Sequence, residues 1–220
     1  MTAVTVQVWQ VAVRDVAAAV VAARLTARRL RRSPVVSFAK VLGTASDDFV
    51  PTAATPRRWA ALTCWREAPD PRLTRWWAQH AEEAATLSLR PLHSTGSWDG
   101  HRPFDVHLHP WDGPVLALTR STVRPTKAVR FYRAVPAVAA ELRAAGGCRV
   151  AFGIGEAPVL RQGTVSIWDS TAAMRTFAYA APQHTRVVAA TPTANWYAEE
   201  LFARFALLDA QGTIDGASVT

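Results

Sequence analysis

The sequence of 220 residues contains only two cysteines, Cys64 and Cys148, and they lack CxxC spacing. We therefore expect buried free thiols in place of a disulfide or a thiolate metal site. No stretch approaches the roughly 18 consecutive apolar residues of a membrane-spanning helix. The N-terminal segment also lacks the basic start and apolar core of a signal peptide. These absences predict a cytoplasmic protein.

Lysine is scarce as well, with Lys40 and Lys127 alone, whereas arginine and alanine abound. The formal net charge of +8 raises the question of nucleic acid, but this composition is typical of a GC-rich coding sequence and we predict no nucleic-acid partner. One basic run closes a predicted helix, where cations favour the negative end of the dipole; an anionic membrane surface or an acidic partner is the alternative. Its members are Arg28, Arg29, Arg31 and Arg32.

The usual catalytic signatures are missing. The sequence has no GxSxG elbow, HExxH pair or Walker loop, and "GIGEAP" lacks the third glycine of a dinucleotide fingerprint. Hydrolase, NTPase and Rossmann functions are therefore disfavoured, and no flavin or nicotinamide motif is present.

Hydrophobic residues make up 50% of the chain, enough for a substantial core. Periodicity and turn residues predict the element order βαββαβ in each half. In the first half we predict strands at 4–13, 35–42, 59–65 and 86–92, with helices at 15–32 and 70–84. In the second half we predict strands at 114–123, 148–156, 164–169 and 201–209, with helices at 127–145 and from 171 onward.

The repeated order, together with the similar segments that end at Trp65 and Trp168, predicts an α+β fold of two ferredoxin-like units. Residues 1–92 form the first unit, 93–112 a connector and 113–220 the second. Together they build within one chain the barrel that small proteins build as a dimeric α/β barrel. Cavities between each sheet and its helices are the expected ligand sites. A homo-oligomer is permitted but not required.

Histidines supply two candidate sites. His93, His101, His107 and His109 lie in the connector among aspartates, and they are either metal ligands or solvated turn residues. His184 lies in "APQHTRVVAATPTANW", where small and β-branched residues permit close approach of a large flat ligand. Neutral imidazole is a good haem-iron ligand; the alternative is a helix N-terminal histidine bonded to a carbonyl or water.

Three cations interrupt apolar strand patterns: Arg204, Arg120 and Lys40. A buried cation needs an anionic ligand or an internal carboxylate, and both remain open. Trp196 is the expected pocket wall. Trp76 and Trp77 cannot both face inward from one helix, so one of them marks a subunit contact or a membrane-facing spot.

Several segments resemble the spheroidene monooxygenase family of carotenoid ketolases. They are "FAKVLGT", "WAALTCW", "SWDG", "ALTRSTV", "RFYRAVPAV", "FGIGEAP", "TVSIWDS", "AMRTFAY" and "WYAEELFARFALLDAQGTIDG". The resemblance covers most of the chain in order. It implies a haem monooxygenase that uses molecular oxygen as co-substrate and external electrons from a ferredoxin-type donor to oxidise a hydrophobic, carotenoid-like or natural-product substrate. The segment before Trp196 is least alike, which leaves the substrate open.

The resemblance also implies residue roles. His184 becomes the axial iron ligand, and Arg204 and Arg120 the catalytic cations near bound oxygen. The other expected cofactor-binding residues are Lys40, Phe131, Phe152, Trp168 and Trp196. A non-catalytic carrier of haem or another hydrophobic ligand and a cofactor-independent barrel oxygenase are the alternatives. A lipophilic substrate is compatible with peripheral membrane contact.

Overall fold

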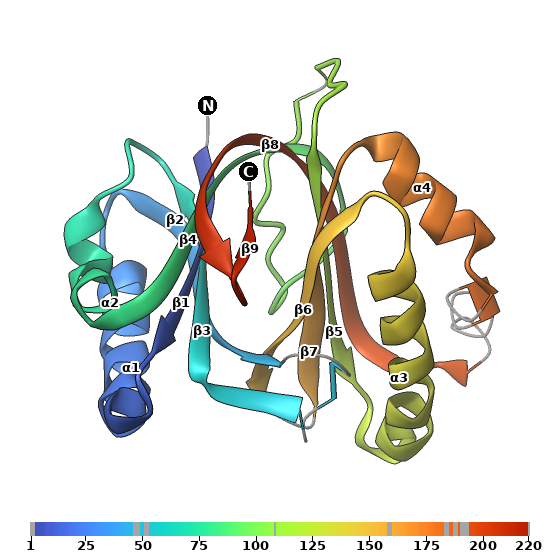
Figure 1. The fold of residues 1–220 in the computed structure, drawn as a ribbon, viewed down its shortest axis with the longest axis horizontal. Coiled ribbons are helices and arrows are strands. Elements are labelled where there is room, and N and C mark those ends of the chain that lie inside the picture. Colours follow the sequence, from blue (N-terminus) through green and yellow to red (C-terminus); the bar gives the residue numbers. More distant parts are fainter. Residues whose placement is uncertain are drawn as a thin grey trace.

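The structure, a computed structural model, describes residues 3–45, 49–50, 53–107, 109–157, 160–182, 185–186, 189 and 194–219. In these ranges eight antiparallel strands close into a barrel and helices α1 to α4 lie outside it (Figure 1). The order around the barrel is β4-β1-β3-β2-β6-β7-β5-β8, and pairing of β4 with β8 completes the circle. The molecule is therefore an α+β barrel.

The elements follow the predicted order in both halves. The first half contains β1 (Ala3–Val11), α1 (Val16–Arg32), β2 (Val36–Ala45), β3 (Ala54–Trp65), α2 (Arg75–His80) and β4 (Ala81–Gly96). The second half contains β5 (Val115–Val123), α3 (Ala128–Ala144), β6 (Cys148–Ala157), β7 (Arg161–Trp168), α4 (Thr171–Ala180) and β8 (Tyr197–Ile214). A two-residue strand, β9 (Ala217–Ser218), pairs with the end of β8.

The two halves meet along ladders of very different length. Strand β4 pairs with β8 from Ala85 opposite Gly212 to Gly96 opposite Leu201. On the other side β2 and β6 pair only where Gly43–Ala45 faces Gly153–Gly155. The barrel is thus closed firmly along one seam and by a short contact along the other.

Strand alternation fills the barrel interior. Val4, Val6 and Val8 on β1 point inward and are almost fully buried, as are Leu116 and Leu118 on β5. Trp98 and Phe104 enter the same core from the segment that links the halves. The interior is therefore packed with side chains.

One predicted helix is shorter than expected. The pattern at 70–84 predicts a single helix, but α2 ends at His80 and β4 starts at Ala81. Ala81 and Glu83 pair with β1, so sheet pairing overrides the helix propensity of this Ala/Glu segment. Strand β8 likewise extends beyond the predicted range 201–209 on both sides.

Other predictions for single residues are confirmed at least in part. Cys64 and Cys148 are both free thiols; Cys64 is buried as expected, whereas Cys148 is only partly buried. Trp77 is fully buried whereas Trp76 is partly exposed and stacks on His80, so the two do not both face inward. No helix in the described ranges combines the length and apolarity needed to span a bilayer.

Candidate functional site

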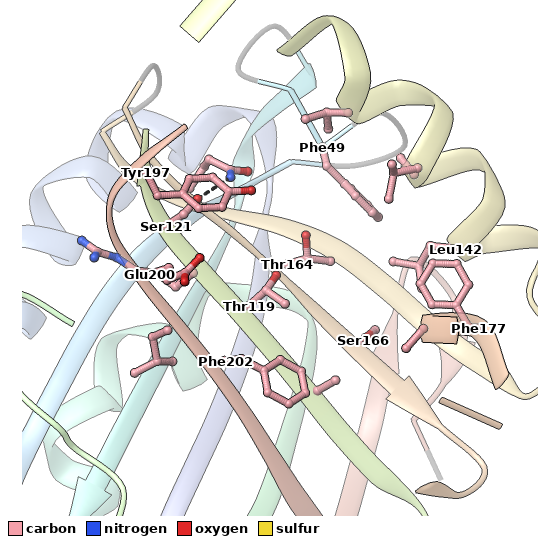
Figure 2. A pocket seen from close by; sticks show the side chains of 18 of the residues that line it. Phe49, Thr119, Ser121, Leu142, Thr164, Ser166, Phe177, Tyr197, Glu200 and Phe202 are labelled. Carbon is pink, nitrogen blue, oxygen red and sulfur yellow. Dashed lines mark hydrogen bonds between the residues drawn. The ribbon is translucent and has the colours of Figure 1, made fainter. Parts of the chain in front are cut away.

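A cavity of about 630 Å³ lies between the outer face of the second-half sheet and helices α3 and α4. Its floor is formed by β5, β7 and β8, and its helix side carries Phe131, Leu142 and Phe177. Figure 2 shows Thr119, Thr164 and Ser166 on the strands that form this floor. The volume lies within the range of roughly 300–1,000 Å³ that is usual for ligand pockets.

The first half fills the corresponding space with indole rings. Trp77 of α2 stacks on Trp9 of β1 with ring centroids 5.0 Å apart, and Trp59 of β3 lies 6.0 Å from it. The second-half sheet carries Ala117, Thr119 and other small residues on its outer face instead. The hollow therefore arises because small side chains stand where the first half has tryptophan.

The cavity floor bears a row of polar groups in an otherwise apolar chamber. Thr119 of β5 lies opposite Thr164 of β7 in the ladder, and Ser121 lies opposite Gln162. The Gln162 amide donates to the Ser121 hydroxyl at 2.9 Å. Such a floor suits a large apolar ligand that carries a few hydrogen-bonding groups.

An aromatic cluster borders the cavity at the start of α3. Phe131 contacts Tyr197 and Trp196 edge to face, with ring centroids 5.7 and 5.8 Å apart. Burial, with the nearby Glu200 carboxylate, raises the pKa of Tyr197 to about 12. Tyr197 therefore stays a neutral hydroxyl at the edge of the cavity.

The predicted pocket residues divide between two faces of the sheet. Phe131 and Trp168 line the cavity, and Trp196 packs against Phe131 beside it. Phe152, expected in the same pocket, lies instead in the barrel core, where the Arg58 guanidinium sits 5.5 Å from its ring. Phe152 points into the barrel because alternate residues of β6 point to opposite faces of the sheet.

His184, the predicted iron ligand, lies outside the described residues. Ala178 of α4 and Tyr197 of β8 both line the cavity, and His184 belongs to the segment that joins these two walls. Among the residues that the structure describes, no three His, Cys, Asp or Glu side chains form a metal-binding group, the connector histidines included.

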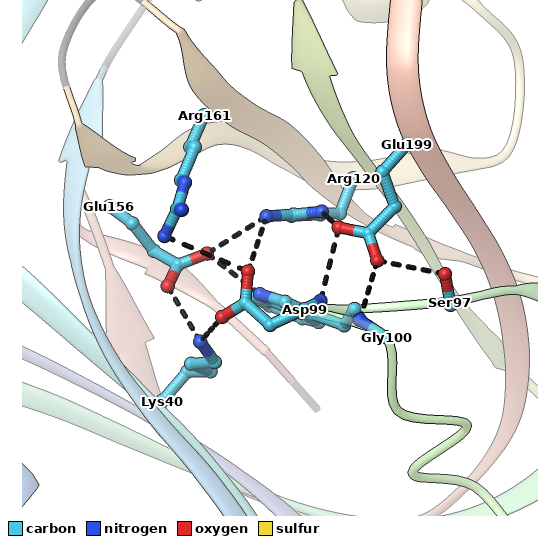
Figure 3. Close-up of polar contacts among 9 residues, drawn as sticks. Lys40, Ser97, Asp99, Gly100, Arg120, Glu156, Arg161 and Glu199 are labelled. Atoms are coloured by element: carbon cyan, nitrogen blue, oxygen red, sulfur yellow. Dashed lines mark hydrogen bonds and ion pairs between the residues drawn. The ribbon is translucent and has the colours of Figure 1, made fainter.

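Lys40 of β2 and Arg120 of β5 lie in a network of ion pairs with carboxylates of β6, β8 and the turn at Asp99 (Figure 3). The Lys40 ammonium binds Glu156 at 2.7 Å and also contacts Asp99. Arg120 is 3% exposed and binds Glu199, with Asp99 at 3.2 Å. Internal carboxylates thus pair with both cations, which is one of the two alternatives that the sequence leaves open; of their nitrogen atoms, only Nε of Arg120 has no partner among the described residues.

Glu199 is the centre of this network and was not singled out in the sequence. Burial opposes its ionisation, but hydrogen bonds from the Gly100 N–H, the Ser97 hydroxyl and Arg120 outweigh burial and lower its pKa to about 2. The network pins the turn that carries Asp99 and Gly100, both with positive φ. A signal was present, because Glu199 shares the inward face of β8 with Leu201 and Ala203.

Arg204 lies on the opposite face of β8, the face that Phe202 presents to the cavity. Its Nε atom is buried and has no hydrogen-bond partner within the described part of the chain. The Nε1 atom of Trp196 is in the same state. Buried donors of this kind are expected to find an acceptor, although neither side chain is among the residues that line the cavity.

The apolar lining of the cavity suits a haem group. Phe131, Trp168 and Phe177 give the apolar surroundings that a macrocycle needs, and Arg204 offers a donor for a carboxylate. Neither histidine nor cysteine occurs among the described cavity-lining residues. Of the residue types that hold haem iron, the described lining contains Met174 and Tyr197; the predicted ligand His184 lies outside the described residues.

Two curated proteins with the same name are similar to this chain over most of its length. Spheroidene monooxygenase of Rhodobacter capsulatus is 33% identical over 199 residues, which cover 86% of this chain and 83% of that protein. Spheroidene monooxygenase of Rubrivivax gelatinosus is 35% identical over 190 residues, covering 83% and 73%. No family model matches the chain.

Solved structures show the same fold in distant proteins. A crystal structure of aldoxime dehydratase matches with a TM-score of 0.60 over 94% of this chain and 81% of that one. The sequences are 12% identical, so the likeness concerns the fold alone.

Proposed function

The chain belongs to the spheroidene monooxygenase family and is a monooxygenase, and we propose that it oxidises a hydrophobic, carotenoid-like substrate in the cavity beneath α3 and α4. The cavity carries this proposal. The barrel has two similar sheet-and-helix faces. Trp9, Trp59 and Trp77 fill the first-half face, whereas the second-half face leaves a chamber of about 630 Å³.

The proposed cofactor is haem, with His184 as its axial ligand. When bound, haem supplies the activation of molecular oxygen for insertion of one oxygen atom into the substrate. Phe131, Trp168 and Phe177 would surround the apolar reactants and exclude water. Arg204 would hold an anionic group through its unpaired Nε donor.

The floor of the cavity would orient the substrate. The hydroxyls of Thr119 and Thr164 stand on neighbouring strands and reach the same chamber. An oxygen-bearing group on an otherwise apolar chain can accept or donate a hydrogen bond there, which fixes the chain along the floor. Tyr197, whose pKa burial raises further above the neutral range, offers another hydroxyl at the rim.

Electrons must come from outside the chain. A monooxygenase places one atom of O₂ in the product and reduces the other to water with two electrons and two protons. Since the sequence has no flavin or nicotinamide motif, a ferredoxin-type protein is the proposed donor.

The barrel itself is proposed to be a duplicated ferredoxin-like unit. The first-half strands are ordered β4-β1-β3-β2 and the second-half strands β8-β5-β7-β6, so corresponding strands occupy corresponding places. This order supports duplication, with residues 1–92 and 113–220 as the two copies and 93–112 as their connector.

An absorption spectrum tests the cofactor and its ligand. Protein produced with a haem precursor is expected to show a Soret band, which His184→Ala shifts or removes while the far-ultraviolet circular dichroism stays unchanged. An unchanged band in His184→Ala would refute the ligand assignment. Colourless protein that still oxidises its substrate would instead establish a cofactor-independent oxygenase.

A further inference from the structure

Helix α1 carries an unusual concentration of positive charge on its outer face. Five arginines, Arg24, Arg28, Arg29, Arg31 and Arg32, are exposed in the second half of the helix, and Val16–Arg32 contains no acidic residue. Ala19, Ala22 and Leu30 attach the opposite face to the barrel. Figure 1 shows α1 on the outside of the first half, away from the cavity helices α3 and α4.

Neighbouring carboxylates neutralise some of the other surface arginines, but not these five within the described ranges. Arg57, Arg72 and Arg149 each bind a neighbouring carboxylate. By contrast, none of the five has a carboxylate within 4 Å among the described residues. Their charge is therefore available to an external anion.

The helix dipole explains only part of this arrangement. Its effect is confined to the last turn, whereas Arg24 and Arg28 lie further from the end at Arg32. Arg24, Arg28 and Arg32 follow one another at intervals of four, where like charges repel. The free helix thus bears a repulsion that an anionic surface would relieve.

Apolar side chains lie beside the arginines on the same exposed face. Val21 is 57% exposed and Leu25 46% exposed. Leu25 also lines a shallow groove with Leu73 of the short 3-10 helix before α2 (Pro71–Thr74), and Arg28, Arg29 and Arg32 border that groove. Guanidinium groups around an apolar groove match the phosphate and the acyl chain of a phospholipid.

We propose that the outer face of α1 docks the protein on an anionic phospholipid surface. We call this face the α1 patch; it consists of Val20, Val21, Arg24, Leu25, Arg28, Arg29, Arg31 and Arg32. The arginines bind the lipid phosphates, while Val21 and Leu25 enter the boundary between headgroups and acyl chains. The proposal stands on the patch alone and holds whatever the cavity binds.

Vesicle co-sedimentation tests the proposal with the full chain. The protein is expected to bind vesicles of phosphatidylcholine mixed with phosphatidylglycerol, but not phosphatidylcholine alone, and to dissociate as salt rises from about 0.1 M to about 1 M. Each basic residue near such a surface contributes about 1 kcal/mol, or about fivefold in partitioning. Arg24→Gln/Arg28→Gln/Arg32→Gln should therefore lower the partition coefficient about a hundredfold.

A control variant separates the patch from the net charge. Arg102→Gln/Arg133→Gln/Arg143→Gln removes three exposed arginines elsewhere and should lower binding less than about fivefold. Val21→Ser/Leu25→Ser should weaken binding while its salt dependence persists. Circular dichroism and thermal melting establish that each variant is folded.

Three results would overturn the proposal. The first is no binding to vesicles that contain phosphatidylglycerol. The second is an equal loss of binding in the two triple variants, which would indicate net charge alone. The third is tighter binding to a duplex oligonucleotide that displaces the vesicles, which would assign the patch to nucleic acid.

Discussion

Replacing Glu199 by glutamine should destabilise the barrel in a manner that depends on pH. The Glu199 carboxylate accepts hydrogen bonds from Ser97 at 2.8 Å, from the Gly100 N–H at 2.8 Å and from the Asp99 N–H at 3.0 Å, and it pairs with Arg120. The glutamine amide carries no charge to form an ion pair with the guanidinium, and it has one acceptor oxygen in place of two. The buried Arg120 is then left with poorer partners, which is costly.

The pKa gives the magnitude. The Glu199 pKa falls from 4.5 to about 2 because these hydrogen bonds outweigh the effect of burial. At about 1.4 kcal/mol per pH unit, the difference corresponds to about 3 kcal/mol of unfolding free energy at neutral pH. Because the pKa is lowered in the folded state, this stabilisation is complete above pH 4.5 and disappears as the pH falls towards 2.

Urea denaturation of the wild type and Glu199→Gln across this range measures the effect. We expect a difference of about 2–3 kcal/mol at neutral pH that shrinks steadily below pH 4.5. Glu200→Gln is the matched control, because the neighbouring side chain is exposed on the cavity face, and it should change stability by less than about 0.5 kcal/mol. A difference for Glu199→Gln that is independent of pH would refute this account of the network.

Three further predictions concern packing and reactivity. Trp77→Ala should lower the unfolding free energy by about 3–5 kcal/mol because the buried indole fills the first-half face. Trp76→Ala should lower it clearly less, and similar losses for the two variants in urea titrations would contradict this prediction. Gly163→Ala should cost about 1–3 kcal/mol because its Cβ would lie 2.1 Å from the Thr119 carbonyl oxygen, whereas Gly43→Ala, 3.8 Å from its nearest neighbour, should cost less. Burial raises the pKa of the Cys64 thiol to about 12, so a thiol reagent at pH 8 should label it only after unfolding; rapid labelling of the folded protein would place Cys64 at the surface.

The sequence was informative where one local pattern determined one element. Alternating apolar residues located the strands, and the order βαββαβ in both halves follows from them. The length of α2 could not be predicted, because Ala81 and Glu83 have helix propensity and become strand only through pairing with β1. Closure of the barrel through β4 and β8 depends on the same distant contacts.

The candidate site was predicted only in part, because its shape also depends on contacts between distant segments of the chain. The sequence indicated cavities between each sheet and its helices, but it did not reveal that Trp9, Trp59 and Trp77 would fill the first of them. Phe152 was assigned to the cavity because the sequence located its strand but did not show which face of the sheet each residue occupies. The partners of Arg120 come from β6, β8 and the turn at Asp99, so only the folded chain brings them together.

Oxygen-18 labelling most directly tests the claim that oxidation takes place in the cavity beneath α3 and α4. Carotenoid-producing cells that express the protein under ¹⁸O₂ would be compared with cells that express Thr119→Trp, which fills the floor of the cavity, and Thr176→Trp, which adds the same side chain at an exposed position of α4. We predict labelled product from the wild type and Thr176→Trp and none from Thr119→Trp. Undiminished labelling with folded Thr119→Trp would contradict the account.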